Sequence, residues 1–380
     1  MTSSRSICRL IYTFCKVRGE KIIVRFLSTE AKHLEMLLSA IEKHRVDEDD
    51  GVEPNSAETW EWEERYVALL WLSQLFFAPF DLASISSQAQ SNHSQAKVDG
   101  TQLDVPGLTW PRAVPSIASR TIPFAIHYLS TSSKERDAAK VLLVRIAMRK
   151  DMQELGVMNA LVKWAISCLR QSDSIEKSTY YYIGVLSFLG GILKSSIGTA
   201  DVDGFLPTIF DVMQRICTSE DDFSRGINAS PVIRQTSVNI LRNISVLLLR
   251  SAGIRGSSEM VEWTIGYLLD SLGDSATPVR IATSKALSVI TLKLAPEMAE
   301  QVIEEILNAL RKDVIRMSTG SQSPDLSTVN PLEWHGLILT LSQLLYRRAP
   351  RFSMTFQIVE AVFNASFRTR EPISPRASVV

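Results

Sequence analysis

Apolar positions recur along most of the chain at the spacing of an α-helix. From Thr29 onward they lie three and four residues apart, as expected when one side of each helix packs against a core. Three stripes illustrate the pattern: Leu155–Leu169, Val238–Leu248 and Met298–Leu310. The last begins just after Pro296, which suits the first turn of a helix because an N–H there would have no partner. The pattern predicts an all-α protein.

The segment Glu61–Leu82 is the most informative part of the chain. After its first turn it is apolar almost all round, and Pro79 then stops it. A helix of this kind is buried between neighbouring helices, because it offers no polar side to water. We therefore expect Trp71 and Leu72 to be core residues.

Two kinds of segment interrupt the helical pattern. Lys21–Leu27 is rich in β-branched residues and predicts a short extended stretch before Ser28 or Thr29 caps the next helix. The second kind of segment is polar and holds too few apolar residues to offset the conformational entropy lost on ordering. They predict polar flexible insertions at residues 46–57, 84–105 and 317–330, and a disordered tail at 369–380.

A repeated motif suggests how the helices are arranged. Ala276–Leu287 has the Val-Arg opening and the small residues of the second helix of a HEAT repeat, and it follows an Asp turn. Ser230–Arg234 repeats the opening about 46 residues earlier, within the ~40–47 residues of HEAT and armadillo units. Glu135–Leu142 is a degenerate third copy. We predict a HEAT/armadillo-like α-α superhelix, or solenoid, over residues 1–368; the alternative is a bundle with irregular connections.

The overall charge argues against a nucleic-acid partner. Lys plus Arg and Asp plus Glu both number 41, for a formal net charge of zero, and no basic stripe stands out. No apolar run reaches the ~18 residues of a membrane span. Residues 1–19 are basic, rich in serine and contain no acidic residue, as in a mitochondrial transit peptide. We prefer an ordinary basic amphipathic helix with an apolar face formed by Ile7, Leu10, Ile11 and Phe14.

The sequence contains no recognisable catalytic or metal motif. Its four cysteines are far apart, and its five histidines lack metal-ligand spacing. The cluster Asp47–Asp50 lacks the alternation of a calcium loop. We interpret Gly190–Gly191 as a point of close helix packing and His335 as a packing or capping residue. No catalytic, cofactor-binding or metal residue is therefore assigned, and we expect no cofactor and no intrinsic enzyme activity.

Several blocks resemble one family. Trp62–Ser73 and Pro79–Leu82, preceded by Tyr12–Lys21 and Val24–Phe26, resemble in order and spacing the N-terminal armadillo-like region of tubulin-folding cofactor D, also called tubulin-specific chaperone D. The resemblance is strong over residues 12–82 and looser over 117–365. Its later part rests on Lys134–Leu142, Val279–Arg280 and Trp334–Gly336.

The resemblance implies a chaperone without a catalytic centre. Members of the family capture β-tubulin after its release from the chaperonin and then assemble with other folding cofactors and α-tubulin. They also associate with an Arf-like small GTPase, and the cofactor assembly stimulates GTP hydrolysis by tubulin. The implied location is the cytoplasm and the microtubule cytoskeleton. Contact residues do not transfer from the resemblance, so the partner-binding residues are unknown.

Two alternatives remain open. One is another HEAT-repeat scaffold, such as a transport receptor or a phosphatase adaptor. The other is a mitochondrial or metabolic enzyme, which only the basic N-terminus suggests. Family members are also much longer, so we expect a truncated slice whose last helix, Phe352–Phe367, has an apolar flank. Such a slice is expected to self-associate, to bind β-tubulin weakly or not at all, and to accelerate no GTP hydrolysis alone.

Overall fold

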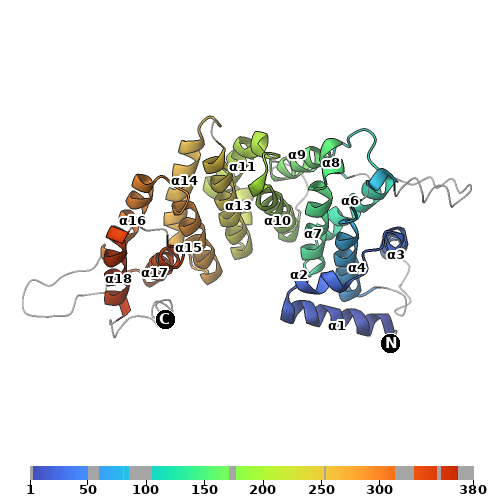
Figure 1. Cartoon of the computed structure of the whole chain (residues 1–380), viewed down its shortest axis with the longest axis horizontal. Coiled ribbons are helices and arrows are strands. Elements are labelled where there is room, and N and C mark those ends of the chain that lie inside the picture. Colours follow the sequence, from blue (N-terminus) through green and yellow to red (C-terminus); the bar gives the residue numbers. More distant parts are fainter. Residues whose placement is uncertain are drawn as a thin grey trace, which may run out of the picture. The chain divides into compact units, whose positions relative to one another are not determined.

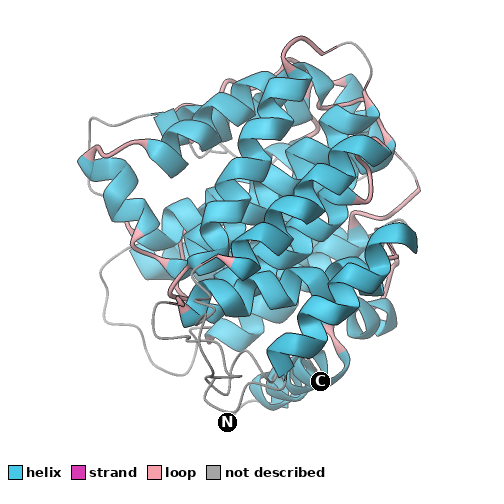
Figure 2. Ribbon diagram, turned by 90° about the vertical axis from the view of Figure 1, so that its left-hand side faces the viewer, coloured by secondary structure: helices cyan, strands magenta, loops and turns pink. Residues whose placement is uncertain are grey.

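A computed structural model of the chain describes residues 3–49, 60–79, 81–84, 105–170, 177–251, 254–312, 329–348 and 352–366. These residues form α-helices and short 3-10 helices joined by loops, and none of them lies in a strand (Figure 2). The all-α prediction is confirmed. Contacts divide the chain into two compact units, Met1–Ser195 (unit 1) and Ser196–Val380 (unit 2). The extent of one solenoid domain over residues 1–368 stays a prediction.

Unit 1 consists of helices stacked in pairs (Figure 1). α4, α7 and α10 pack side by side in an inner row, while α3, α6 and α9 each cover one of them. α1 packs against α4. The helices of this unit are α1 (Ser3–Arg18), α2 (Glu20–Ile23), η1 (Val24–Phe26), α3 (Lys32–Asp49), α4 (Trp62–Leu75), α6 (Ser116–Leu129), α7 (Glu135–Ala147), α8 (Lys150–Glu154), α9 (Val157–Arg170) and α10 (Thr179–Ser195).

Unit 2 repeats this plan. α13, α15 and α17 form the inner row, and α11, α14 and α16 are their paired helices (Figure 1). α18 packs against α16 and α17. The helices are η2 (Ser196–Gly198), η3 (Asp203–Phe205), α11 (Leu206–Thr218), α12 (Asp222–Asn228), α13 (Pro231–Arg250), α14 (Ser257–Asp270), η4 (Ser271–Gly273), α15 (Thr277–Thr291), α16 (Pro296–Arg311), α17 (Pro331–Tyr346) and α18 (Phe352–Ser366).

Local sequence explains where many of these helices begin. Pro231, Pro296 and Pro331 occupy the first helical position of α13, α16 and α17, where proline costs no hydrogen bond. The Asn330 side chain caps α17 by accepting from the N–H of Leu332 at 3.0 Å. Asp221 caps α12 in the same way. Helix starts are therefore encoded within one turn of sequence.

Each unit contains one glycine that allows an inner helix to touch the backbone of a covering helix, and the two contacts are equivalent. A Cβ added to Gly184 in α10 would lie 2.2 Å from the carbonyl oxygen of Leu129, at the end of α6. A Cβ added to Gly336 in α17 would lie 2.2 Å from the carbonyl oxygen of Leu272, in η4 just after α14. In both cases an inner helix meets the end of the covering helix of the preceding pair. Only glycine permits that approach.

Gly191 supports the interpretation of Gly190–Gly191 as a packing point. A Cβ on Gly191 would lie 2.7 Å from Cγ2 of Val144 in the neighbouring helix α7. The contact involves a side chain, whereas Gly184 and Gly336 face backbone. Close helix packing therefore explains Gly191 without any role in phosphate binding.

Some local expectations are wrong. Lys21–Leu27 does not form an extended stretch, because Gly19, at φ 87°, reverses the chain and α2 and η1 follow. Trp71 is only partly buried, although Leu72 is a core residue as expected. The indole N–H of Trp71 donates to the carbonyl of Ser28 at 2.8 Å, which holds the ring at the edge of the core.

Phe77, just past the end of α4, also differs from the expected all-round burial. Its ring is exposed, and the guanidinium of Arg145 lies 3.0 Å from the ring centroid. Burial lowers the pKa of Arg145 to about 10.

Met298, the first residue of the predicted stripe Met298–Leu310, is exposed because it lies in the first turn of α16. The residues of the stripe that follow it are buried.

The predicted insertions lie mostly outside the described residues. The helix α3 extends to Asp49 and so includes the first residues of the segment 46–57. Val105, the last residue of the predicted insertion 84–105, is buried. Residues 85–104 and 313–328 and the tail from 367 lie outside the described part of the chain, as does most of 46–57.

Candidate partner-binding surfaces

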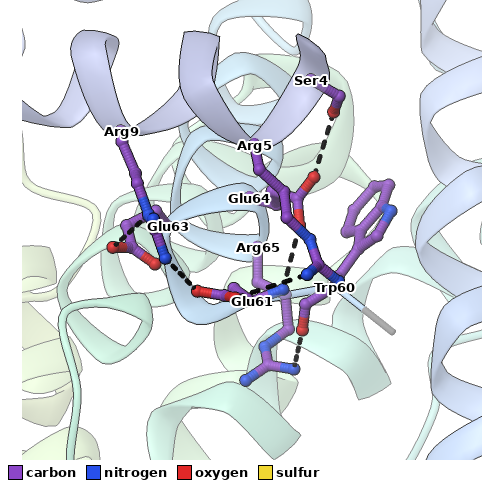
Figure 3. Close-up of polar contacts among 8 residues, drawn as sticks. All are labelled: Ser4, Arg5, Arg9, Trp60, Glu61, Glu63, Glu64 and Arg65. Carbon is purple, nitrogen blue, oxygen red and sulfur yellow. Dashed lines mark hydrogen bonds and ion pairs between the residues drawn. The ribbon is translucent and has the colours of Figure 1, made fainter. Parts of the chain in front are cut away.

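Ion pairs attach α1 to the beginning of α4. Arg9 Nη2 lies 2.7 Å from Glu61 Oε2, and Arg5 Nε lies 3.4 Å from Glu64 Oε2 (Figure 3). Ser4 donates to Oε1 of Glu64 at 3.0 Å. The second oxygen of Glu64 also accepts the N–H of Glu61 at 3.0 Å, which satisfies a free N–H group at the start of α4. Glu64 therefore both caps α4 and holds α1.

The same cluster extends to α7. Arg65 donates to the carbonyl of Trp60 at 2.8 Å, which fixes the backbone two residues before α4 (Figure 3). Its Nε forms a very short ion pair with Glu135 at the start of α7, and Glu135 is buried. The starts of α1, α4 and α7 are thus joined by alternating positive and negative side chains.

The ion pairs turn the apolar side of α1 outward. Ile7, Leu10, Phe14 and Val17 follow one another at helical spacing, and all four are exposed. Phe26, in the adjacent η1, is 82% exposed. The expectation of a basic amphipathic helix is confirmed, but Ile7, Leu10 and Phe14 of its apolar face point outward and Ile11 is half-buried. Arg5, Tyr12 and the buried Cys15 lie on the side that faces α4. Contiguous exposed apolar side chains mark contact surfaces, so this stripe is a candidate partner-binding surface.

The ion pair of Arg5 with Glu64 should contribute measurably to stability because Glu64 is buried. We expect Arg5→Ala and Glu64→Ala to lower the free energy of unfolding by about 1–3 kcal/mol each, with a coupling of about 1 kcal/mol in the double mutant. Urea unfolding measures both values. The exposed pair Lys150–Glu154, at 4.0 Å, is the matched control and should show almost no coupling. Equal coupling in the two pairs would contradict a structural role for the cluster.

In unit 2 an arginine and an aspartate join successive helix pairs. Arg234 at the start of α13 binds Asp274 with two hydrogen bonds, of 2.7 and 3.0 Å. Asp274 also accepts the N–H of Ala276 at 2.7 Å, before α15. Burial alone would raise the pKa of Asp274, but these hydrogen bonds and the charge of Arg234 outweigh it and lower the pKa. The contact stabilises the stack.

His335 lies in the next contact of this series. Arg280 in α15 is buried, and its Nε donates to Nδ1 of His335 in α17 at 2.9 Å. Its Nη1 donates to the carbonyl of Asp274 at 2.6 Å. Burial and the charge of Arg280 both lower the pKa of His335, so the ring is neutral at pH 7. His335 is a packing residue, as expected, with its Nδ1 already engaged as an acceptor.

The cysteines do not form a nucleophilic or metal site within the described part of the chain. All four are free thiols. Burial raises the pKa of Cys8 and Cys217 to about 11, and burial also raises the pKa of Cys15 and Cys168. These thiols are protonated at neutral pH and therefore poor nucleophiles. The described residues contain no group of His, Cys, Asp and Glu side chains arranged to hold a metal ion.

No helix in the described part of the chain combines the length and the apolar character needed to cross a bilayer. The surfaces that remain are exposed helix faces. Besides the stripe on α1, a second lies on α18, where Phe356, Val359 and Phe363 are exposed and Ile358 is buried. The apolar flank expected for the last helix is therefore present. These faces, and the stacked helix pairs beneath them, are what the fold offers to a partner.

A family match covers the part of the chain that contains the stacked pairs α3/α4 and α6/α7. Residues 1–169 match the ARM repeat of the tubulin-specific chaperone D-like family. The similarity to a chaperone of this kind also extends further. The chain is 24% identical over 379 residues to Tubulin-folding cofactor D of Schizosaccharomyces pombe, a match that covers 94% of the chain.

The two matches confirm the resemblance predicted from the blocks around Trp62–Leu82. With the stacked helix pairs, they also confirm the all-α, armadillo-like solenoid fold. The chain spans 29% of the length of the Schizosaccharomyces pombe cofactor. The attachment of α1 through Glu61 and Glu64 was not predicted from the sequence. The signal was present as three glutamates at the start of α4 and two arginines four residues apart in α1.

Proposed function

We propose that this chain acts in tubulin folding by binding β-tubulin and contributing to assembly of the αβ-tubulin heterodimer. The observation that supports the proposal is the similarity to Tubulin-folding cofactor D along 94% of the chain. The family match over residues 1–169 points to the same family. A stack of helix pairs suits a folding client, because its extended surface makes many dispersed contacts instead of one pocket.

The proposal extends to partners and location. The family resemblance supports binding of other tubulin-folding cofactors together with α-tubulin, and of an Arf-like small GTPase. The chain itself is proposed to be non-catalytic, with any acceleration of GTP hydrolysis on tubulin arising from the cofactor assembly. The proposed location is the cytoplasm and the microtubule cytoskeleton. Buried, protonated thiols and a neutral, hydrogen-bonded His335 are consistent with a non-catalytic role.

Chemical crosslinking with purified tubulin tests the proposal, since crosslinking also captures weak complexes. We expect crosslinks from the chain to β-tubulin in excess over α-tubulin, and no acceleration of GTP hydrolysis by the chain alone. An excess of unlabelled chain should compete with the crosslinks, whereas serum albumin should not. Crosslinking of β-tubulin equal to that of serum albumin would contradict the proposal. It would favour a HEAT-repeat scaffold of another kind, such as a transport receptor or a phosphatase adaptor.

A further inference from the structure

The two helix rows of unit 2 carry opposite charges. α14 and α16 are rich in acidic side chains, among them the exposed Glu262 and Glu304, whereas the single acid of α11, Asp211, is balanced by Arg215. The inner row of α13, α15 and α17 is different (Figure 1). α13 and α15 contain no Asp or Glu, and α17 contains only Glu333, in its first turn. The net charge of zero for the whole chain therefore conceals a separation of charge within this unit.

The basic side chains of the inner row differ in their partners. Arg234 and Arg250 form ion pairs with aspartates of neighbouring segments, so they serve the fold. Arg242 in α13 and Arg347 at the end of α17 form no ion pair with any residue that the structure describes. Lys285, on the exposed side of α15, is likewise without an ion pair among those residues. Lys285 is thus exposed and Arg242 and Arg347 are half-buried, and none of the three has a carboxylate partner among the described residues.

Arg242 and Arg347 belong to the two inner helices that flank α15. Nε of Arg347 donates to Oγ of Ser288 in α15 at 2.9 Å. Arg242 lies on the neighbouring helix α13 and donates to the side-chain oxygen of Asn243 at 3.1 Å. Partial burial lowers the pKa of Arg242, and repulsion by the positive charge of Arg347 lowers it further. Two partly buried positive charges that repel each other are stabilised when an anion binds both of them.

Exposed apolar side chains lie at the ends of the same three helices and indicate what kind of anion fits. Leu249 ends α13, Leu292 follows α15 and Tyr346 ends α17, and each is exposed. A polypeptide with carboxylates and apolar side chains can use both parts of this surface. A free phosphate would leave the apolar part uncovered, and a nucleic acid needs a longer row of cations than this surface provides.

We propose that the exposed side of α13, α15 and α17 is a docking surface for an acidic segment of a partner protein, whose carboxylates bind Arg242 and Arg347. The planar guanidinium binds a carboxylate through two parallel hydrogen bonds, which gives both strength and orientation. The proposal does not depend on the identity of the partner. It can therefore fail while tubulin binding succeeds, or succeed while tubulin binding fails.

Fluorescence anisotropy with a labelled oligoglutamate peptide and the whole chain tests the proposal. We expect binding that weakens as salt rises. Arg242→Gln and Arg347→Gln should each weaken it about tenfold, the equivalent of one charge-assisted hydrogen bond. Arg311→Gln is the matched control, because it removes an exposed positive charge from α16 in the acidic row. It should change the affinity by less than about twofold.

Thermal stability separates docking from a structural role. Arg242→Gln removes one of two repelling charges, so the melting temperature should stay the same or rise while affinity for oligoglutamate falls. The proposal is overturned if neither arginine variant weakens binding, or if Arg311→Gln weakens it equally. Tighter binding of a single-stranded oligonucleotide than of oligoglutamate would also overturn it, in favour of a nucleic-acid partner. A melting temperature of Arg242→Gln that falls together with affinity would indicate a structural role instead.

Discussion

Gly336→Ala is expected to destabilise unit 2 by about 3 kcal/mol, near the upper end of the usual cost of overpacking. The added methyl would lie 2.2 Å from the carbonyl oxygen of Leu272 and 2.9 Å from its carbonyl carbon. Because these are backbone atoms at a helix end, they cannot move aside as a flexible side chain does. α17 would have to shift away from η4, and the contact of Arg280 with His335 would shift with it. Urea unfolding of the variant measures the loss.

Other glycines of the same chain provide a graded control. Gly184→Ala should cost about as much in unit 1 as Gly336→Ala does in unit 2, because the blocking atoms and distances are the same. Gly191→Ala should cost less, since it meets only a methyl of Val144. Gly266, exposed in the middle of α14, has nothing within 4 Å of an added Cβ. Gly266→Ala should therefore stabilise by about 1 kcal/mol through helix propensity. A similar effect at Gly336 and Gly266 would contradict the close approach.

Trp164→Ala should lower the free energy of unfolding by about 3–5 kcal/mol. Trp164 in α9 is among the largest fully buried side chains, with 1% of its surface exposed. Its ring centroid lies 6.4 Å from that of Phe188 in α10, so truncation leaves a cavity between the two helices of one pair. Surrounding side chains come from regular helices and can collapse into that cavity only in part.

Trp71→Ala is the matched comparison and should cost only about 2 kcal/mol, from one hydrogen bond and part of the ring's burial. The indole of Trp71 is partly exposed, and its N–H donates to the carbonyl of Ser28. Chemical unfolding of the two variants under identical conditions tests the difference. An equal loss of stability in both would mean that Trp71 is packed as tightly as Trp164.

The comparison of these two tryptophans shows how far sequence predicts burial. Both lie in strongly apolar helical stretches, and sequence favoured Trp71 because the helix around it is apolar on nearly every side. The structure instead buries Trp164 and leaves Trp71 at the edge. Helical periodicity identifies the side of a helix that faces the core, but the depth of a side chain depends on which other helix covers it. That information lies in segments far away in the chain.

The orientation of α1 has a similar explanation. Its pattern of Ile7, Leu10 and Phe14 predicts a helix with one apolar side, and such a side normally faces the core. Arg5 and Arg9 reverse this expectation because they find carboxylates at the start of α4, more than fifty residues later. Several charge-assisted hydrogen bonds together with the packing of Tyr12 against Trp62 decide which side of α1 is buried.

What the sequence by itself determined is local. The apolar stripes, the prolines at helix starts and the Val-Arg openings were sufficient for the all-α solenoid. Only the tertiary structure decided which helix ends Gly184 and Gly336 touch, which face of α1 points outward, and that Arg347 reaches Ser288 of α15. The physical reason is the separation along the sequence of the residues that interact. Helix formation depends on neighbours within one or two turns, whereas these contacts join residues 40 or more positions apart, whose meeting depends on how whole helices pack.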